Sequence, residues 1–120
     1  MGRPVVHFEV IGRDAKRLQD FYGQLFEWKI NSANPMGYGI VDTGSKEGIQ
    51  GGIAQSDSEN SWVTFYVQVK DLQATLDRAA ELGGETVLPP TDVPGTVSLA
   101  VLKDPEGHTI GLVQAQGQTG

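Results

Sequence analysis

The stretch PVVHFEVIG (4–12) opens the pattern that determines the fold. It is rich in Val, Ile and Phe, and its polar and apolar residues alternate. This composition is typical of a β-strand. Apolar residues then recur at the spacing of one helix face, at Ala15, Leu18, Tyr22 and Leu25. Asp14 stands just before them and is the predicted N-cap, whose carboxylate accepts from backbone N–H groups that the first helical turn leaves unpaired.

Three short β-prone segments follow this helix, separated by Asn, Pro and Gly. They are EWKIN (27–31), YGIVDT (38–43) and GIQGGIAQ (48–55). The polar tract SDSENS (56–61) is predicted to be a linker.

The pattern then starts again with a predicted strand, WVTFYVQV (62–69), and a second N-cap, Asp71. The second helical stripe comprises Leu72, Leu76, Ala79 and Ala80. Gly83 and Gly84 are predicted to end this helix. Three further strands are predicted at ETVL (85–88), TVSLAVLKD (96–104) and HTIGLVQ (108–114). Each half of the chain therefore reads β-α-β-β-β.

An offset of 57 residues aligns the two halves and brings identical residues together. The pairs are Val6 and Val63, Phe8 and Phe65, Val10 and Val67, Asp14 and Asp71, Asp20 and Asp77, and Leu25 and Leu82. We therefore predict one domain over 1–120, made of modules 4–55 and 62–115 and a tail, 116–120, without core-forming residues. The alternative is a generic α+β domain with coincidental similarity between its halves.

Composition limits the partners that the chain can have. Its 120 residues contain no cysteine, so a disulfide framework and a thiolate metal site are excluded. The formal charge of −6 and the absence of a Lys/Arg cluster argue against nucleic acid and against an anionic membrane. No apolar run approaches 18 residues and no secretory signal is visible, so we expect a soluble, cytoplasmic protein. Small molecules and proteins remain as partners.

The segments FYGQLFEWKI (21–30) and DPEGHTIGLVQ (104–114) resemble motifs of the vicinal oxygen chelate superfamily. This superfamily includes glyoxalase I, extradiol dioxygenases, epimerases, and bleomycin- and fosfomycin-resistance proteins. The first segment resembles the passage from helix to second strand, and the second resembles the Asp-Pro-x-Gly turn before the last strand. The resemblance implies an α+β fold whose two tandem βαβββ modules form a curved, partly open, β-barrel-like cleft. It also implies a homodimer.

Metal-dependent members of the superfamily take ligands from the first and last strands of each module. The corresponding positions here are His7, Gly52, Thr64 and Gly111. Two glycines and a threonine leave His7 as the residual ligand, so we expect no metal cofactor. The alternative is a divalent metal held through His7, Glu9 and Gln50, or with residues of a second chain.

His7 and Glu9 lie two residues apart and are predicted to share one face of their strand, opposite Phe8 and Val10, which face the helix. We expect His7 to line a cleft for an organic ligand and, beside Glu9, to be partly protonated near neutral pH. The pair is also a candidate for acid–base catalysis, with a purely structural pair as the alternative. A buried histidine bonded to Thr64 or to a backbone carbonyl is a further alternative.

The other predicted ligand-binding residues are Tyr38, Gln50, Trp62, Thr64 and Tyr66, whose aromatic members offer surface for stacking on a planar ligand. Trp28 is predicted to pack in the core and His108 to lie exposed in a turn. Gly51 and Gly52 indicate close backbone approach within a strand. The stretch VLPPTDVPGTVS (87–98) is predicted to be a loop, either a lid over the cleft or a stiff connector.

These observations predict a small-molecule-binding protein that takes an aromatic or partly apolar organic compound without a metal. The first alternative is a metal-dependent, glyoxalase-like lyase, isomerase or dioxygenase. The second is an accessory domain that packs with itself or with a partner.

Overall fold

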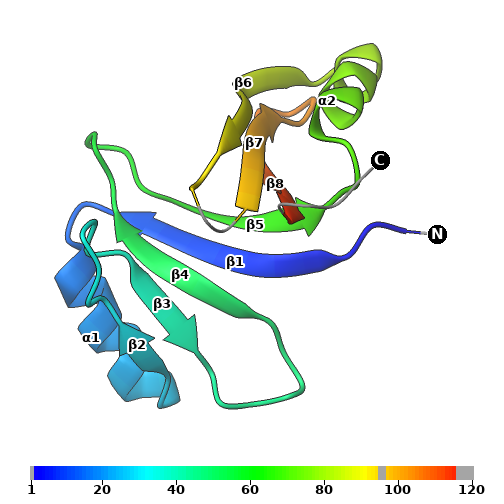
Figure 1. Cartoon of the computed structure of the whole chain (residues 1–120). Coiled ribbons are helices and arrows are strands. Elements are labelled where there is room, and N and C mark those ends of the chain that lie inside the picture. The colour runs from blue at the N-terminus through cyan, green and yellow to red at the C-terminus, as the bar shows by residue number, and fades with distance from the viewer. Residues whose placement is uncertain (1, 95–96, 116–120) are drawn as a thin grey trace. The chain divides into compact units, whose positions relative to one another are not determined.

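The computed structural model describes residues 2–94 and 97–115, and within them the element order β-α-β-β-β occurs twice (Figure 1). The first repeat consists of β1 (Val5–Gly12), α1 (Ala15–Phe26), β2 (Lys29–Asn31), β3 (Gly39–Asp42) and β4 (Gln50–Gln55). The second consists of β5 (Trp62–Gln68), α2 (Leu72–Glu81), β6 (Glu85–Asp92), β7 (Val97–Lys103) and β8 (Thr109–Ala115). The predicted α+β fold with a duplicated βαβββ unit is confirmed.

Strand pairing is the same in both repeats. The first strand runs parallel to the last one, β1 with β4 and β5 with β8, and the other pairs are antiparallel. The resulting strand orders are β2-β3-β4-β1 and β5-β8-β7-β6. In the first repeat this order places His7 beside Gln50 and Glu9 beside Gly52.

The chain divides into two compact units that differ slightly from the predicted modules. One unit is His7–Thr64, and the other joins the N-terminal residues up to Val6 with the chain from Phe65 onward. A hydrogen bond explains part of this division, because the Gln68 N–H donates to the Pro4 carbonyl oxygen at 2.9 Å. The predicted tail, 116–120, lies outside the described residues.

Both predicted helix N-caps are confirmed. The Asp14 carboxylate accepts from the Arg17 N–H at 3.1 Å, and the Asp71 carboxylate accepts from the Ala74 N–H at 3.0 Å. The predicted glycine ending of α2 is confirmed too, with Gly83 in the left-handed region at φ +99°. The next N–H, that of Gly84, donates back to the Ala79 carbonyl oxygen at 2.8 Å, which is the pattern of a Schellman motif.

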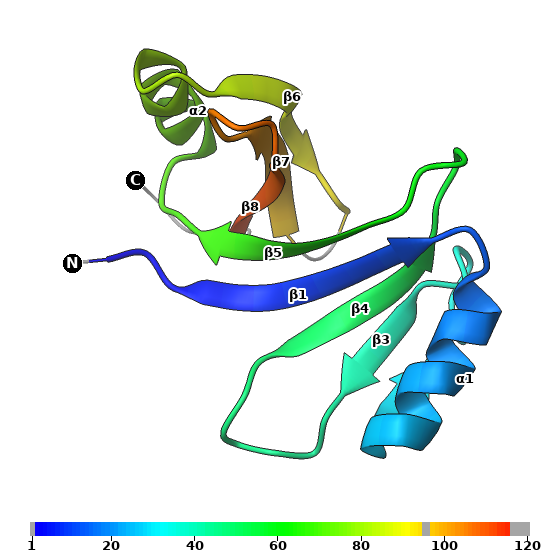
Figure 2. The same cartoon turned by 180° about the vertical axis from the view of Figure 1, so that it is seen from behind.

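Each repeat has its own hydrophobic core, in which a helix packs on the sheet of the same repeat. In the first repeat the buried residues are Val10, Val41 and Ile53, and Phe8, Leu18, Tyr22, Trp28 and Ile30 pack against them. Phe8 and Val10 therefore face α1 as predicted. Figure 2 shows α1 lying alongside the strands of its own repeat. Trp28 packs in this core, with its ring centroid 5.4 Å from that of Phe8, as predicted.

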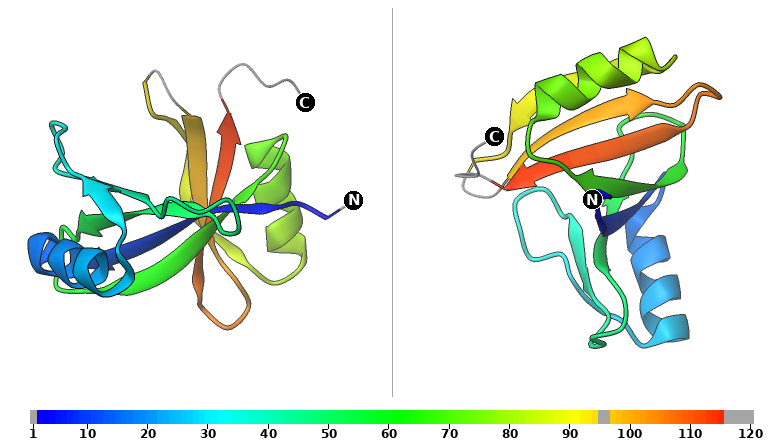
Figure 3. Two further views of the ribbon diagram at one scale, coloured as in Figure 1. Left: turned by 90° about the horizontal axis from the view of Figure 1, so that it is seen from below. Right: turned by 90° about the vertical axis from the view of Figure 1, so that its right-hand side faces the viewer.

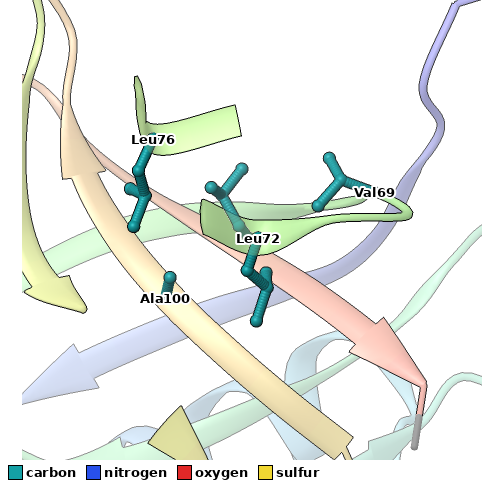
Figure 4. Close-up of a cluster of buried hydrophobic side chains, with 5 residues drawn as sticks. Val69, Leu72, Leu76 and Ala100 are labelled. Atoms are coloured by element: carbon teal, nitrogen blue, oxygen red, sulfur yellow. The ribbon is translucent and has the colours of Figure 1, made fainter. Parts of the chain in front are cut away.

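The core of the second repeat is formed by Val69, Leu72, Leu76, Ala100 and Leu112. Figure 4 shows Leu72 and Leu76 close to Ala100, and Figure 3 shows α2 lying along β7. Val67 packs against this cluster. Because side chains alternate along a strand, Tyr66 points to the opposite face of β5.

The predicted loop at 87–98 is wrong over most of its length, because β6 continues to Asp92 and β7 begins at Val97. Pro89 and Pro90 are accommodated since β6 is the last strand in its order and its register with β7 shifts between Leu88 and Thr91. Proline lacks the N–H that a central strand would need, but an edge strand tolerates it. Residues 95–96 lie outside the described chain.

Candidate functional site

Three polar side chains of the unit His7–Thr64 meet at the hydroxyl group of Tyr38. The His7 Nε2 lies 3.0 Å from the Tyr38 Oη, and the same hydroxyl donates to the Glu9 Oε2 at 2.8 Å. His7 and Glu9 come from β1 and point away from the face covered by α1, as their alternation with Phe8 and Val10 predicted. Tyr38 comes from the turn before β3, and β4 lies between β3 and β1 in the sheet.

The hydrogen-bond pattern determines which ring nitrogen of His7 carries a proton. An ionised carboxylate only accepts, so the single phenolic proton of Tyr38 is donated to Glu9. The Tyr38 oxygen then accepts from His7, whose Nε2 must be protonated. The site therefore holds a directed chain of donors that runs from His7 through Tyr38 to Glu9.

Asn34 holds Tyr38 in place, although the sequence interpretation did not select it. Its side-chain amide donates to the Tyr38 carbonyl oxygen at 2.7 Å, and its Oδ1 accepts from the Tyr38 N–H at 3.0 Å. Gly37, in the left-handed region at φ +65°, completes the turn. The dipeptide Asn34-Pro35 is a turn signal that could have indicated this role, because Asn side chains often bond to nearby backbone.

Glycine at position 52 leaves the space that the Tyr38 ring occupies. A Cβ atom built on Gly52 would overlap the Tyr38 hydroxyl and its ring carbon Cζ. Gly51 faces the other side of the sheet, where the Phe8 ring would lie 2.6 Å from its Cβ atom. The predicted close approach at this glycine pair is therefore real, but aromatic side chains make it and not another backbone segment.

The second repeat contains the same kind of contact. A Cβ atom on Gly111 would lie 2.7 Å from the Tyr66 Cγ, because the Tyr66 ring covers this glycine from the neighbouring strand β5. In each repeat the predicted ligand position on the last strand is thus a glycine covered by a tyrosine.

The residues around His7 do not fit a metal site of the kind that the resemblance implied. Among the described residues, no group of three or more His, Cys, Asp or Glu side chains is placed to hold a metal ion. The Gln50 Oε1, an alternative ligand, accepts from the Thr43 N–H at 2.7 Å. An acidic side chain at position 52 or 111 would collide with a tyrosine ring.

Burial has the largest effect on the pKa of His7. Removal from water lowers the pKa of its imidazole below the ordinary 6.5, and the negative charge of Glu9 raises it by less. Desolvation outweighs the neighbouring carboxylate, so His7 binds a proton less readily than an ordinary histidine, whereas the sequence interpretation expected Glu9 to favour the protonated form.

Among the other predicted site residues, Gln50 lies beside His7 on the paired strand β4. Gln50 supports the Thr43 backbone, Thr64 is buried, and Tyr66 belongs to the other compact unit. Trp62 lines a hollow beside α1 that does not include His7, Glu9 or Tyr38.

His108 lies in an exposed turn, as predicted. Its backbone N–H donates to the Asp104 Oδ1 at 3.0 Å and holds the pKa of the Asp104 carboxyl below its ordinary value. The His108 Nδ1 lies 2.9 Å from the Asp104 Oδ2, and the imidazole is 70% exposed.

Comparison with known proteins identifies the family. Residues 7–113 match the family model described as glyoxalase-like domain. The chain belongs to the glyoxalase-like domain family. Its predicted membership of the vicinal oxygen chelate superfamily is thereby confirmed.

Two curated relatives, from Mycobacterium bovis and Mycobacterium tuberculosis, carry the name "Putative glyoxylase CFP32". Each is 34% identical over 59 residues, which cover 49% of this chain and 22% of the relative. The glyoxalase-like chain thus spans about a fifth of the length of these curated relatives.

Solved structures share the fold at low identity. A glyoxalase/bleomycin resistance protein/dioxygenase superfamily member from Vibrio splendidus gives a TM-score of 0.65 at 17% identity, covering 94% of this chain and 99% of that one. Methylmalonyl-CoA epimerase from Mycobacterium tuberculosis gives 0.66 at 14% identity, covering 92% and 86%. A trihydroxybiphenyl dioxygenase from Sphingomonas wittichii gives 0.64 at 11% identity, covering 98% and 42%. The fold therefore occurs in proteins with different named activities, and it does not select a reaction.

Proposed function

We propose that this glyoxalase-like domain binds a small organic molecule with an aromatic or partly apolar body, at the face formed by His7, Glu9 and Tyr38, and does so without a metal ion. The observation that carries the proposal is the position of Tyr38, whose hydroxyl covers Gly52 and bonds to both His7 and Glu9. A phenol occupies the space into which a ligating side chain would have to project.

The three groups suit recognition of a hydroxyl or carbonyl group on the ligand. A neutral imidazole, a phenol and a carboxylate together offer donors and acceptors, and the Tyr38 ring adds a flat apolar surface. Small-molecule sites commonly combine apolar surface with a few fixed polar groups of this kind. Asn34 supplies the rigidity, since it holds the Tyr38 backbone on both its N–H and its carbonyl sides.

A second candidate function is metal-independent proton transfer, as in an isomerase or a lyase. The observation that favours it is the continuous hydrogen-bond chain through His7, Tyr38 and Glu9. A neutral histidine with a lowered pKa can accept a proton at neutral pH. The metal-dependent alternative has less support, because the Tyr38 ring covers Gly52 and the Gln50 Oε1 accepts from the Thr43 N–H.

Thermal denaturation in the presence of a panel of phenols, aromatic ketones and aldehydes tests the binding function. A compound that binds only the native state should raise the midpoint of unfolding of the unaltered chain. The rise should fall by at least about half in Tyr38→Phe and in His7→Gln, since each removes one polar anchor. His108→Gln is the matched control, because His108 lies in an exposed turn and belongs to neither the Tyr38 site nor the core.

Two results would contradict the proposal. One is a set of compounds that stabilise Tyr38→Phe and His7→Gln as strongly as the unaltered chain. The other is a stoichiometric transition metal that remains with the purified protein after dialysis. The homodimer and the cytoplasmic location stay predictions, and sedimentation at several protein concentrations tests the former.

A further inference from the structure

We infer a second binding site on the α1 side of β1, which takes a small organic anion with an aromatic body and a carboxylate or sulfonate group. The site lies wholly within the unit His7–Thr64. It is separate from the proposed site at Tyr38, because Val10 lines it while the neighbouring Glu9 points to the other face of β1.

The site is a hollow of about 720 Å³. Its wall is formed by the end of β1, the β1–α1 turn, the first half of α1 and the start of β5. The lining includes Arg13, Arg17, Phe21, Tyr22, Trp62 and Val63. The volume lies in the range of about 300–1,000 Å³ that is usual for small-molecule sites.

The walls of the hollow expose large apolar side chains. Phe21 is 57% exposed and Val63 is 71% exposed, and Trp62 and Tyr22 stand beside them. An aromatic ligand that covered these side chains would remove apolar surface from water, which is favourable.

Two arginines give the hollow its preference for an anion. In the described part of the chain, neither the Arg13 nor the Arg17 guanidinium has an ion pair or a hydrogen bond. Lys16, between them in sequence, is paired with Asp20 at 3.1 Å. The Asp14 carboxylate is engaged in capping the helix at the Arg17 N–H.

The hollow brings two cations together on a chain whose net charge is negative. The protein carries a net charge of −6, yet two of its nine basic residues lie unpaired at one apolar hollow. A guanidinium is suited to carboxylate and related oxyanions, which it can bind through two parallel N–H donors. An amphipathic anion therefore satisfies both the apolar walls and the two cations.

The test uses two fluorescent probes of similar shape, the anion anilinonaphthalene sulfonate and the neutral phenylnaphthylamine. The unaltered chain should bind the sulfonate, and the double variant Arg13→Gln, Arg17→Gln should bind it about fivefold or more weakly, with little change for the neutral probe. Lys16→Gln is the matched charge control and should leave both affinities unchanged, because Lys16 is not part of the lining.

A second pair of variants locates the apolar wall. Phe21→Ala should weaken both probes, whereas Leu25→Ala, which alters an equally exposed apolar residue on the same helix outside the lining, should weaken neither. Tyr38→Phe should leave probe binding unchanged, so failure here and failure of the proposed function are distinguishable. The inference is overturned if the double arginine variant binds the sulfonate as tightly as the unaltered chain. It is also overturned if self-association in solution buries the hollow and excludes the probes.

Discussion

At His7, burial and a neighbouring carboxylate act in opposite directions on one imidazole. Desolvation is the larger effect and lowers the pKa of His7 below 6.5, although Glu9 opposes it. His7 should therefore titrate below 6.5 in an NMR experiment that follows its ring protons. His7→Gln assigns the signals, because it leaves His108 as the remaining histidine. A His7 midpoint above 6.5 would show that the Glu9 charge is dominant instead.

The same pKa shift links stability to pH. Below about pH 6.5 the unfolded chain takes up a proton on His7 that the folded chain binds less readily, so the free energy of unfolding should fall as the pH decreases through this region. Above pH 6.5 the contribution is fully present. Urea denaturation at pH 7.5 and 5.5 should show a larger loss for the unaltered chain than for His7→Gln, which cannot titrate. Equal losses for both proteins would contradict this assignment.

Tyr38 is expected to stabilise the native state through its hydroxyl group. Tyr38→Phe removes two hydrogen bonds and leaves His7 and Glu9 without this shared partner. The expected loss is about 1–2 kcal/mol in the free energy of unfolding. Urea denaturation measures it, and Tyr22→Phe provides the reference for removing a hydroxyl from an aromatic cluster of the same repeat. A loss no greater than that of Tyr22→Phe would show that the hydrogen-bond chain contributes little to stability.

Gly52 and Tyr38 should be energetically coupled. Gly52→Ala places a methyl group where the Tyr38 ring lies, so it should cost about 1–3 kcal/mol through overpacking. In a Tyr38→Ala background the same substitution should cost much less, because the ring is gone. A double-mutant cycle in urea measures the coupling. Additive effects of the two substitutions would show that the chain avoids the overlap in another way.

Part of this site could be predicted from the sequence, and the reason is local geometry. Alternation along β1 is sufficient to place His7 and Glu9 on one face. Tyr38 was among the predicted ligand-binding residues, but its hydrogen bonds to His7 and Glu9 could not be predicted, because they depend on β3 pairing with β4 and β4 with β1, which are contacts between distant segments. The lowering of the His7 pKa by burial could not be predicted for a similar reason, since burial is a property of the folded chain.

Among the secondary-structure elements, the helix N-caps are the features that the local sequence predicts most clearly. Asp14→Ala and Asp71→Ala should each lower the free energy of unfolding by about 1 kcal/mol, because each removes the acceptor for a first-turn N–H. Asp14→Asn and Asp71→Asn keep an acceptor oxygen and should lose much less. Urea denaturation of the four variants checks the prediction. Equal losses for the Ala and Asn variants would assign the effect to charge and not to capping.

Strand β6 shows where local information was insufficient. Its two consecutive prolines predicted a loop, and the segment is nonetheless a strand. The difference arises because β6 is the last strand in the order β5-β8-β7-β6, where a missing N–H removes no bond on the open side. Position in the sheet decides whether proline is tolerated, and the sequence of the segment alone does not contain that position.

In the whole molecule, both repeats share one feature: a tyrosine ring covers a glycine at the position where the superfamily resemblance implied a metal ligand. Tyr38 covers Gly52 in one repeat and Tyr66 covers Gly111 in the other. The duplicated fold could be predicted from the sequence because the caps and strand residues recur at one offset. The position of a tyrosine ring over each glycine could not, since it depends on the pairing of segments far apart in sequence, β3 with β4 and β5 with β8.

This chemistry leads to a prediction about metals. A divalent ion at 100 times its dissociation constant would add about 2.7 kcal/mol to the free energy of unfolding, a shift of several degrees in the midpoint of a chain of this size. We expect no such shift for the unaltered chain with Zn²⁺, Mn²⁺, Ni²⁺ or Fe²⁺, because tyrosine rings occupy the space of the acidic ligands.

The double variant Tyr38→Ala, Gly52→Glu is the positive control, since it removes the ring and places a carboxylate beside Glu9 on the paired strand. Differential scanning calorimetry with and without a chelator measures both proteins. If the unaltered chain gains as much stability from a metal as the variant does, the tyrosines do not replace the ligands, and the metal-free site proposed for this domain is wrong.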